Sequence, residues 1–289
     1  MSHTGNVVNA KHTGYLILLT CLCLVAVFLS SGHAQDKPHT SHSLHSTVTA
    51  VQPGQDFRII LQQDIDKGWH TYWKNPGDSG TPTAVRWTLE NGGEVGDLRF
   101  PVPKRIPADP LMTFGYEDQV LYTAPVKVPD NFQGDTFKIK ADLETLVCEE
   151  EVCIPEFEIL NLSIPVGPGK STNQDLLARA DKKFPQTPGW GAEFNFDEDT
   201  LTLTVIPDQS LIQDILNARS VYVFPESWGI IDITSSPVVM QSAEKEISLK
   251  FPLDGKKSPA KLETFSGLLR VSAKDQATFY EISAPFAGR

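Results

Sequence analysis

The sequence predicts an all-β protein: an immunoglobulin-like antiparallel β-sandwich, followed by a second β-rich domain with one or two short helices. Apolar and polar residues alternate over many short stretches, which is the period of a half-buried strand. Turn-rich stretches such as NPGDSGTP (75–82) and VPDNFQGD (128–135) separate these segments. About seven such strands without a helical period are typical of a β-sandwich.

The clearest strand of the first domain covers 137–144, where apolar Phe137, Ile139, Ala141 and Leu143 alternate with charged residues. The same reasoning predicts the other strands of this domain at 47–51, 57–64, 85–89, 120–128 and 157–164.

A domain boundary is predicted at PVGPGKST (165–172), because proline and glycine cluster there. The domains then cover 36–166 and 172–287. The second begins with a helix at 173–184, which Pro185 ends. It continues with a short helix at 210–218 and with strands at 201–206, 221–224, 230–233, 246–251, 268–272 and 278–283. The run FPESWGIID (224–232) is interpreted as the start of a strand with a buried Trp228.

The N-terminus predicts export. Residues 15–29 are an apolar run, and Gly32 and Ala34 supply the small residues of a cleavage site. This pattern is a secretory signal peptide over 1–34, cleaved after Ala34. The run is short for a membrane span, which needs about 20 residues, so a retained anchor is the second interpretation.

Charge and motifs exclude several functions. The chain has 36 acidic and 25 basic residues and a formal charge of −11, which argues against nucleic acid as a partner. His70 is the only histidine outside the N-terminal tail, so hydrolysis with a histidine base is disfavoured. His39, His42 and His45 recur every third residue, but a mobile tail lacks the rigid scaffold of a metal site. We therefore predict no metal site and no cofactor.

Two cysteines remain after the leader, Cys148 and Cys153 in LVCEEEVCIPE (146–156). They follow the best-patterned strand, and a turn there can bring their Cα atoms within the 4.4–6.8 Å that a disulfide requires. Closing so small a loop stabilises the fold by much less than the ~3 kcal/mol of a 15-residue loop. Because the bond would stabilise the fold so little, a redox role is favoured. The alternative is a permanent local bond in a non-redox binding or chaperone module.

The carboxylates of Glu149, Glu150, Glu151 and Glu156 disfavour a nearby thiolate, so we expect thiols with a normal or raised pKa. Such thiols suit a carrier that reacts mainly inside a docked complex. The other interpretation is an acidic turn that serves only solubility.

Three segments carry a resemblance to a known family: GWHTYWKNPGDSG (68–80), PLMTFGYEDQVLY (110–122) and LVCEEEVCIPE. In this order and inside a predicted sandwich, they resemble the N-terminal periplasmic domain of the thiol:disulfide interchange protein DsbD. The likeness is closer to its longer relative ScsB, the suppressor of copper sensitivity protein. This resemblance relates the non-redox alternative, a binding or chaperone module, to copper tolerance. The chain differs from common DsbD members in placing four residues between the cysteines, where they have five.

The resemblance implies an electron carrier of the thiol:disulfide oxidoreductase type in the periplasm. A separate membrane-embedded thiol reductase would supply electrons, and periplasmic thioredoxin-fold oxidoreductases would receive them. Cys153 would form the mixed disulfide with partners, and Cys148 would resolve it. Phe114, with Tyr116 beside it, would cap the disulfide. His70 and Tyr72 would face the cysteines and tune them, whereas Trp69 and Trp73 would fill the core.

Overall fold

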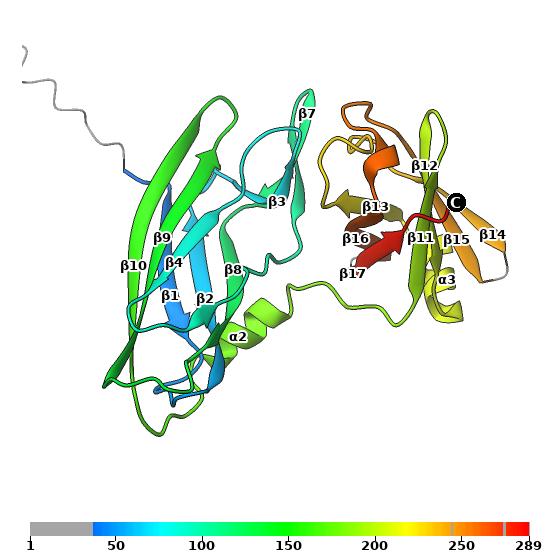
Figure 1. Ribbon diagram of the computed structural model, residues 1–289. Coiled ribbons are helices and arrows are strands. Elements are labelled where there is room, and N and C mark those ends of the chain that lie inside the picture. Colours follow the sequence, from blue (N-terminus) through cyan, green and yellow to red (C-terminus); the bar gives the residue numbers. More distant parts are fainter. Residues whose placement is uncertain (1–36, 244, 274–275, 289) are drawn as a thin grey trace, which may run out of the picture. The chain divides into compact units, whose positions relative to one another are not determined.

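The computed structural model describes residues 37–243, 245–273 and 276–288. From His39 onward these residues belong to one unit. Figure 1 shows its strands and its two helices. They are mostly antiparallel strands with two short α-helices, which confirms the predicted all-β, immunoglobulin-like class. Within the described residues, no helix is both long and apolar enough to cross a membrane. The predicted signal peptide lies outside the described residues.

Two sheets form the sandwich of the N-terminal part (residues 39–171). One has the order β1-β2-β8-β5 and the other β10-β9-β4. Their inward-facing residues alternate along each strand, as on β9, where Phe137, Ile139 and Ala141 are at most 1% exposed. The strands are β1 (Thr40–Ser46), β2 (Asp56–Ile65), β4 (Ala84–Leu89), β5 (Glu94–Val95), β8 (Gln119–Lys127), β9 (Thr136–Cys148) and β10 (Cys153–Pro165).

The strand predicted at 47–51 is wrong, because the first strand is β1, directly before it. The histidine triplet therefore borders or lies in a sheet and is not a mobile tail. His42 is bonded at Nδ1 to Glu158 (2.8 Å) and at Nε2 to the side-chain amide of Gln63 (2.8 Å). The described part of the chain contains no group of three or more His, Cys, Asp or Glu residues that could hold a metal ion.

A buried glutamine ties several strands of the sandwich together. Gln63 of β2 is fully buried, and its side-chain oxygen accepts hydrogen bonds from the hydroxyls of Thr71 (2.9 Å) and Tyr122 (3.2 Å). Its amide nitrogen donates to the hydroxyl of Thr145 (3.2 Å). These bonds satisfy the polar atoms of a side chain that would otherwise be costly to bury.

A third, smaller sheet has the order β3-β7-β6 and comprises β3 (Thr71–Gly77), β6 (Lys104–Ala108) and β7 (Leu111–Tyr116). The sequence pattern does not predict β3, because Asn75, Pro76 and Gly77 are typical of a turn, and it does not predict β6 or β7 either. Gly115 of β7 permits the close pairing with β3, since a Cβ atom there would lie 2.0 Å from the carbonyl oxygen of Thr71.

The C-terminal part (residues 172–288) contains both predicted helices, α2 (Gln174–Asp181) and α3 (Gln209–Leu216). The Asp208 carboxylate caps α3 by accepting a hydrogen bond from the Leu211 amide (2.9 Å). One sheet has the order β11-β12-β15-β14 and the other β13-β16-β17. The elements are β11 (Gly191–Phe196), β12 (Thr200–Ile206), β13 (Ser220–Pro225), β14 (Val238–Ala243), β15 (Glu246–Pro252), the 3-10 turn η1 (Pro259–Lys261), β16 (Thr264–Ala273) and β17 (Gln276–Pro285).

Two expectations for this part are wrong. Residues 230–233 are not a strand, because the Asp232 carboxylate accepts hydrogen bonds from the backbone and hydroxyl of Thr234 and so folds a turn. Trp228 is not buried but 39% exposed, with the ammonium groups of Lys256 and Lys257 over its ring. No described sheet combines strands from both sides of 165–172. The division into two domains stays a prediction.

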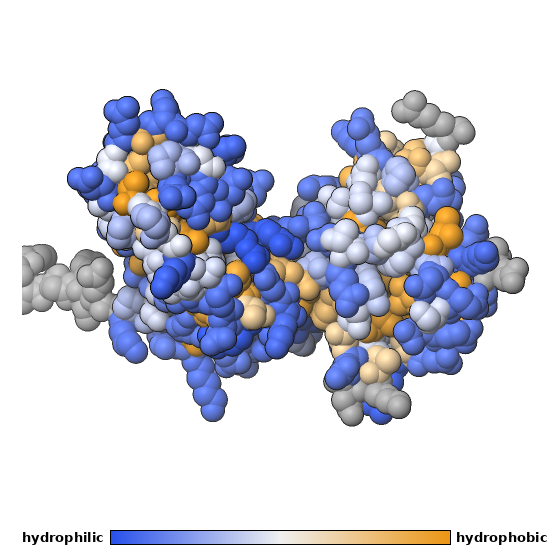
Figure 2. All heavy atoms as spheres, turned by 90° about the horizontal axis from the view of Figure 1, so that it is seen from below, coloured by the Kyte–Doolittle hydropathy of each residue, from blue (hydrophilic) through white to orange (hydrophobic). Residues whose placement is uncertain are grey.

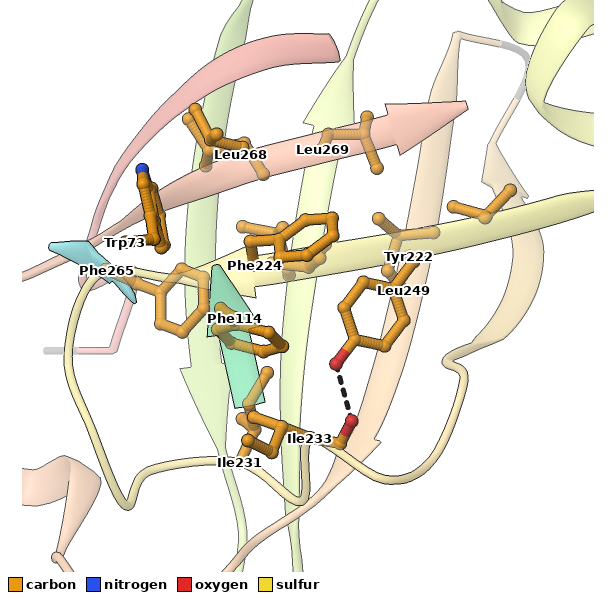
Figure 3. Packing of buried hydrophobic residues seen from close by; sticks show 14 of the residues in the cluster. Trp73, Phe114, Tyr222, Phe224, Ile231, Ile233, Leu249, Phe265, Leu268 and Leu269 are labelled. Carbon is orange, nitrogen blue, oxygen red and sulfur yellow. Dashed lines mark hydrogen bonds between the residues drawn. The ribbon is translucent and has the colours of Figure 1, made fainter. Parts of the chain in front are cut away.

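Four aromatic residues form an interlocked group, here called the aromatic cluster: Trp73, Phe114, Tyr222 and Phe224 (Figure 3). The ring centroids of Phe114 and Phe224 are 4.9 Å apart, and those of Trp73 and Phe224 are 6.3 Å apart, both in edge-to-face contact. The Tyr222 hydroxyl donates to the Ile233 carbonyl (2.5 Å). The cluster therefore joins β3 and β7 to β13 in one hydrophobic core.

Candidate functional site: an asymmetric disulfide

The two cysteines are bonded across the β9–β10 hairpin. Cys148 ends β9, Cys153 begins β10, and the two are direct partners in the register. The Glu149 amide donates to the Val152 carbonyl (2.9 Å), which leaves Glu150 and Glu151 as a two-residue turn. The Sγ–Sγ distance is 2.06 Å and the Cα–Cα distance is 4.1 Å. The hairpin predicted from the sequence thus brings the pair into bonding distance.

The two halves of the disulfide differ in exposure. Cys148 is 1% exposed, whereas Cys153 is exposed. The cause lies in the backbone: Cys148 and His70 exchange two hydrogen bonds, N–H of His70 to the Cys148 carbonyl (2.8 Å) and N–H of Cys148 to the His70 carbonyl (3.0 Å). This pairing brings the start of β3 against Cys148, while Cys153 stays open to solvent. Cys153 is therefore the more accessible of the two cysteines.

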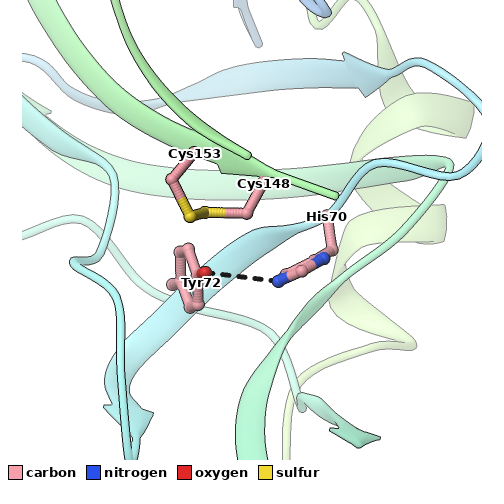
Figure 4. The surroundings of a disulfide bond; sticks show 4 residues. All are labelled: His70, Tyr72, Cys148 and Cys153. Atoms are coloured by element: carbon pink, nitrogen blue, oxygen red, sulfur yellow. Dashed lines mark hydrogen bonds between the residues drawn. A yellow bond between two sulfur atoms is a disulfide. The ribbon is translucent and has the colours of Figure 1, made fainter. Parts of the chain in front are cut away.

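His70 and Tyr72 lie beside the disulfide (Figure 4). A hydrogen bond of 3.2 Å joins Nε2 of His70 to the hydroxyl oxygen of Tyr72, and the two rings meet edge to face. Burial lowers the pKa of His70, against an opposing effect of Glu117, and burial raises the pKa of Tyr72. Both side chains are therefore neutral at pH 7, so they place polar but uncharged groups beside the disulfide. We call His70 and Tyr72 the floor of the disulfide.

Gly80 also belongs to the site, although no pattern in the sequence around it (NPGDSGTP, 75–82) indicates a functional role. Its φ is +103°, and a Cβ atom there would lie 2.3 Å from Cε1 of Tyr72. Only glycine satisfies both conditions without strain, because it has no Cβ atom and tolerates a positive φ. Gly80 thus allows the Tyr72 ring to lie where it does.

Phe114 and Tyr116 are buried in the hydrophobic core. Phe114 is fully buried, and its ring packs in the aromatic cluster. Tyr116 is 5% exposed and donates its hydroxyl hydrogen bond to the Pro101 carbonyl (2.7 Å), with a pKa well above the usual value because of burial. The capping role of Phe114 stays a prediction.

The other residues named from the sequence fall into two groups. Trp73 is fully buried, as predicted, whereas Trp69 is half-buried and stacks on His39 with ring centroids 3.7 Å apart. Among the acidic residues, Glu149, Glu150 and Glu151 are exposed at the turn. Glu156 instead accepts hydrogen bonds from the backbone amides of His39 (2.6 Å) and Thr40 (3.1 Å), which fastens β1 to β10.

Residues 42–163 match the family described as the N-terminal part of the thiol:disulfide interchange protein DsbD. We call residues 42–163 the DsbD N-terminal segment. The resemblance inferred from three short stretches is thereby confirmed for the DsbD N-terminal segment, which contains both cysteines, His70 and Tyr72. A comparison with curated proteins finds no match.

Among solved structures, the chain is similar to the N-terminal periplasmic domain of ScsB from Proteus mirabilis. The two share 18% sequence identity with a TM-score of 0.60, and the match covers 87% of this chain and 95% of that domain. The likeness extends beyond the DsbD N-terminal segment into the C-terminal part. At this identity it establishes a shared fold.

Proposed function

We propose that the chain carries electrons by reversible disulfide exchange through Cys148 and Cys153, between a membrane-embedded thiol reductase and thioredoxin-fold oxidoreductases in the periplasm. The observation that carries the proposal is the unequal exposure of the two cysteines in a DsbD N-terminal segment. A purely structural bond has no need of one accessible sulfur. A carrier needs one sulfur for the partner and one for release.

The exposure favours a defined order of steps. In the reduced carrier, the Cys153 thiolate attacks a disulfide sulfur of the partner, whose own S–S bond breaks as a mixed disulfide forms. Cys148 then loses its proton and attacks Sγ of Cys153, which releases the partner as a dithiol. Two electrons pass to the partner, and the bond between Cys148 and Cys153 forms again. Electron uptake from the reductase is the same sequence in reverse.

Trapping tests the two roles. The Cys148→Ala variant should accumulate a mixed disulfide through Cys153, because nothing resolves it, and the matched Cys153→Ala variant should not. Non-reducing electrophoresis followed by mass spectrometry of the linked peptides measures both. Capture by the Cys153→Ala variant alone would reverse the assignment of the two cysteines.

A redox titration tests the proposal as a whole. A carrier should have a reduction potential in the range of thioredoxin-family proteins, about −120 to −270 mV. If the wild-type bond stays oxidised in a dithiol buffer poised below about −300 mV, the bond is structural and the alternative of a non-redox binding or chaperone module is favoured.

The cellular location is part of the proposal. The similar ScsB structure is a periplasmic domain, and the sequence predicts a leader that ends at Ala34. Expression of the full chain in a Gram-negative host should yield a periplasmic protein whose first residue is Gln35. Intact mass spectrometry of the osmotic-shock fraction measures this, and a product that keeps residues 1–34 in the membrane fraction would favour the anchor.

A further inference from the structure

An exposed apolar row runs along β10 from the accessible cysteine. Side chains alternate in direction along a strand, so Cys153, Pro155, Phe157 and Ile159 lie on one face of β10. All four are exposed, Phe157 by 71% and Ile159 by 59%. We call Pro155, Phe157 and Ile159 the β10 stripe. The residues between them face the sandwich interior.

The surface around Phe157 and Ile159 of the β10 stripe is polar. Its register partners on β9 include Glu144 opposite Phe157 and Asp142 opposite Ile159, and β4 adds Arg86 beside Asp142. A shallow hollow of about 600 Å³ lies on this face, lined in part by Arg86, Glu144, Phe157 and Ile159. The space-filling view likewise shows apolar patches within a largely hydrophilic surface (Figure 2). Large apolar side chains side by side on an exposed sheet face indicate an interaction surface.

The β10 stripe begins close enough to Cys153 to be covered by a protein bonded to that cysteine. A strand rises about 3.3 Å per residue, which places Phe157 about 13 Å and Ile159 about 20 Å from Cys153. A protein interface of standard size covers about 800 Å² on each partner, a disc of about 16 Å radius. Any folded protein whose sulfur bonds to Cys153 in an interface of this size therefore covers Phe157 if it is centred on the cysteine.

The acidic residues around the β10 stripe determine which charges a partner needs at the edge of its interface. Glu149, Glu150 and Glu151 are exposed at the turn next to Cys153, and Glu144 is exposed beside Phe157. A partner that covers this region must place cationic groups opposite these carboxylates, because like charges across an interface are unfavourable.

We propose that the β10 stripe is the docking surface for the protein that exchanges disulfides with Cys153. The partner carries an apolar patch around its reactive cysteine and Lys or Arg residues at the edge that meets the glutamates. This inference rests on the proposed function, since it uses Cys153 as the attacking sulfur. It adds the surface by which the partner is selected.

Two peptides with one activated cysteine each serve as probes, one with Leu and Lys around the cysteine and one with Ser and Glu. Each cysteine is joined to thionitrobenzoate. The Cys153 thiolate of the Cys148→Ala variant attacks the peptide sulfur, the peptide–thionitrobenzoate bond breaks, and the coloured thionitrobenzoate anion leaves. We expect the Leu/Lys peptide to react about tenfold faster, and the second-order rate constant to fall about fivefold in a Phe157→Thr/Ile159→Thr background.

The matched control is Val238→Thr, which replaces an exposed apolar residue on β14 (61% exposed) and should leave the rate constant unchanged. All variants should react equally with the small disulfide of thionitrobenzoate. Equal rates for the two peptides, or a full rate in the stripe variant, would overturn the docking proposal. So would a dimer of the wild-type chain that becomes a monomer in the stripe variant on sedimentation, because the stripe would then bind a second copy. The proposed function fails separately, through the redox titration of the wild-type bond.

Discussion

Tyr72 and Trp73 are neighbours on β3, yet they belong to opposite environments. The Tyr72 ring lies against a disulfide that is open to solvent on one side, and its hydroxyl is bonded to His70. The Trp73 ring lies in the aromatic cluster, where its Nε1 is buried without a hydrogen-bond partner among the described residues. On β3, Tyr72 thus lies beside the disulfide, whereas the next residue, Trp73, packs in the hydrophobic core. Stability and sulfur reactivity should therefore respond to different substitutions.

The largest expected effect is a loss of stability from a substitution in the aromatic cluster. Phe224→Ala should lower the free energy of unfolding by about 3–5 kcal/mol, because it empties a fully buried aromatic site. Urea denaturation followed by tryptophan fluorescence measures this. The matched control is Phe157→Ala, at 71% exposure, which should change stability by less than about 0.5 kcal/mol. Equal losses in the two variants would show that the aromatic cluster does not stabilise the fold.

Gly80→Ala should act on the disulfide side and cost about 1–3 kcal/mol, because it combines a positive φ with a collision against the Tyr72 ring. Gly255→Ala separates the two causes, since Gly255 also has a positive φ (+76°) but nothing lies within 4 Å of its added Cβ atom. The difference between the two variants reports the contact with Tyr72. We also expect faster reduction of the bond by dithiothreitol in Gly80→Ala alone, because a displaced Tyr72 ring would leave the disulfide more open. An unchanged rate would show that the position of this ring does not affect the bond.

Tyr72→Phe keeps the ring and removes the hydroxyl, so it should cost about 0.5–1.5 kcal/mol. A double-mutant cycle with His70→Phe isolates the contribution of the hydrogen bond between the two side chains. A coupling energy near zero would mean that the bond does not stabilise the floor of the disulfide.

The smallest effect concerns pH. Burial lowers the pKa of His70 in the folded chain, so the unfolded chain binds the proton more tightly. The contribution of His70 to stability is therefore complete above the unfolded pKa of about 6.5 and is lost as the pH falls through the folded pKa. The urea concentration at the midpoint of unfolding, measured between pH 7.5 and 5, should fall less steeply with decreasing pH in His70→Gln than in the wild type. An identical slope would exclude this origin.

The sequence was most informative where local chemistry determines structure. Strand alternation and an acidic turn predicted the hairpin that joins Cys148 to Cys153, and an Asp at the cap position suits the start of α3. The positions of His70 and Tyr72 came from family resemblance, because no local pattern relates residue 70 to residue 148. Their proximity depends on a backbone bridge between segments far apart in the chain.

Errors arose where long-range pairing overrides local preference. β3 contains Asn75, Pro76 and Gly77, which read as a turn, but the Asn75 side chain donates to the Pro225 carbonyl (2.6 Å) and accepts from the Gly77 amide (3.1 Å). The apolar pattern at 230–233 predicted a strand, but the Asp232 carboxylate stabilises a turn instead. The packing of Phe114 against Phe224 joins residues over a hundred positions apart, and periodicity carries no information about such a contact.

The buried amide of Gln63 has a consequence for evolution and engineering at this site. It reaches Thr71, one residue before Tyr72, and Thr145, three residues before Cys148. It thus fixes the spacing between the strand that carries the floor of the disulfide and the strand that carries the shielded sulfur, without touching either sulfur. Replacing this amide by a hydrocarbon of the same shape, as in Gln63→Leu, would leave every residue of the redox centre in place. We expect it to disturb the strand alignment that keeps Cys148 buried and Cys153 exposed.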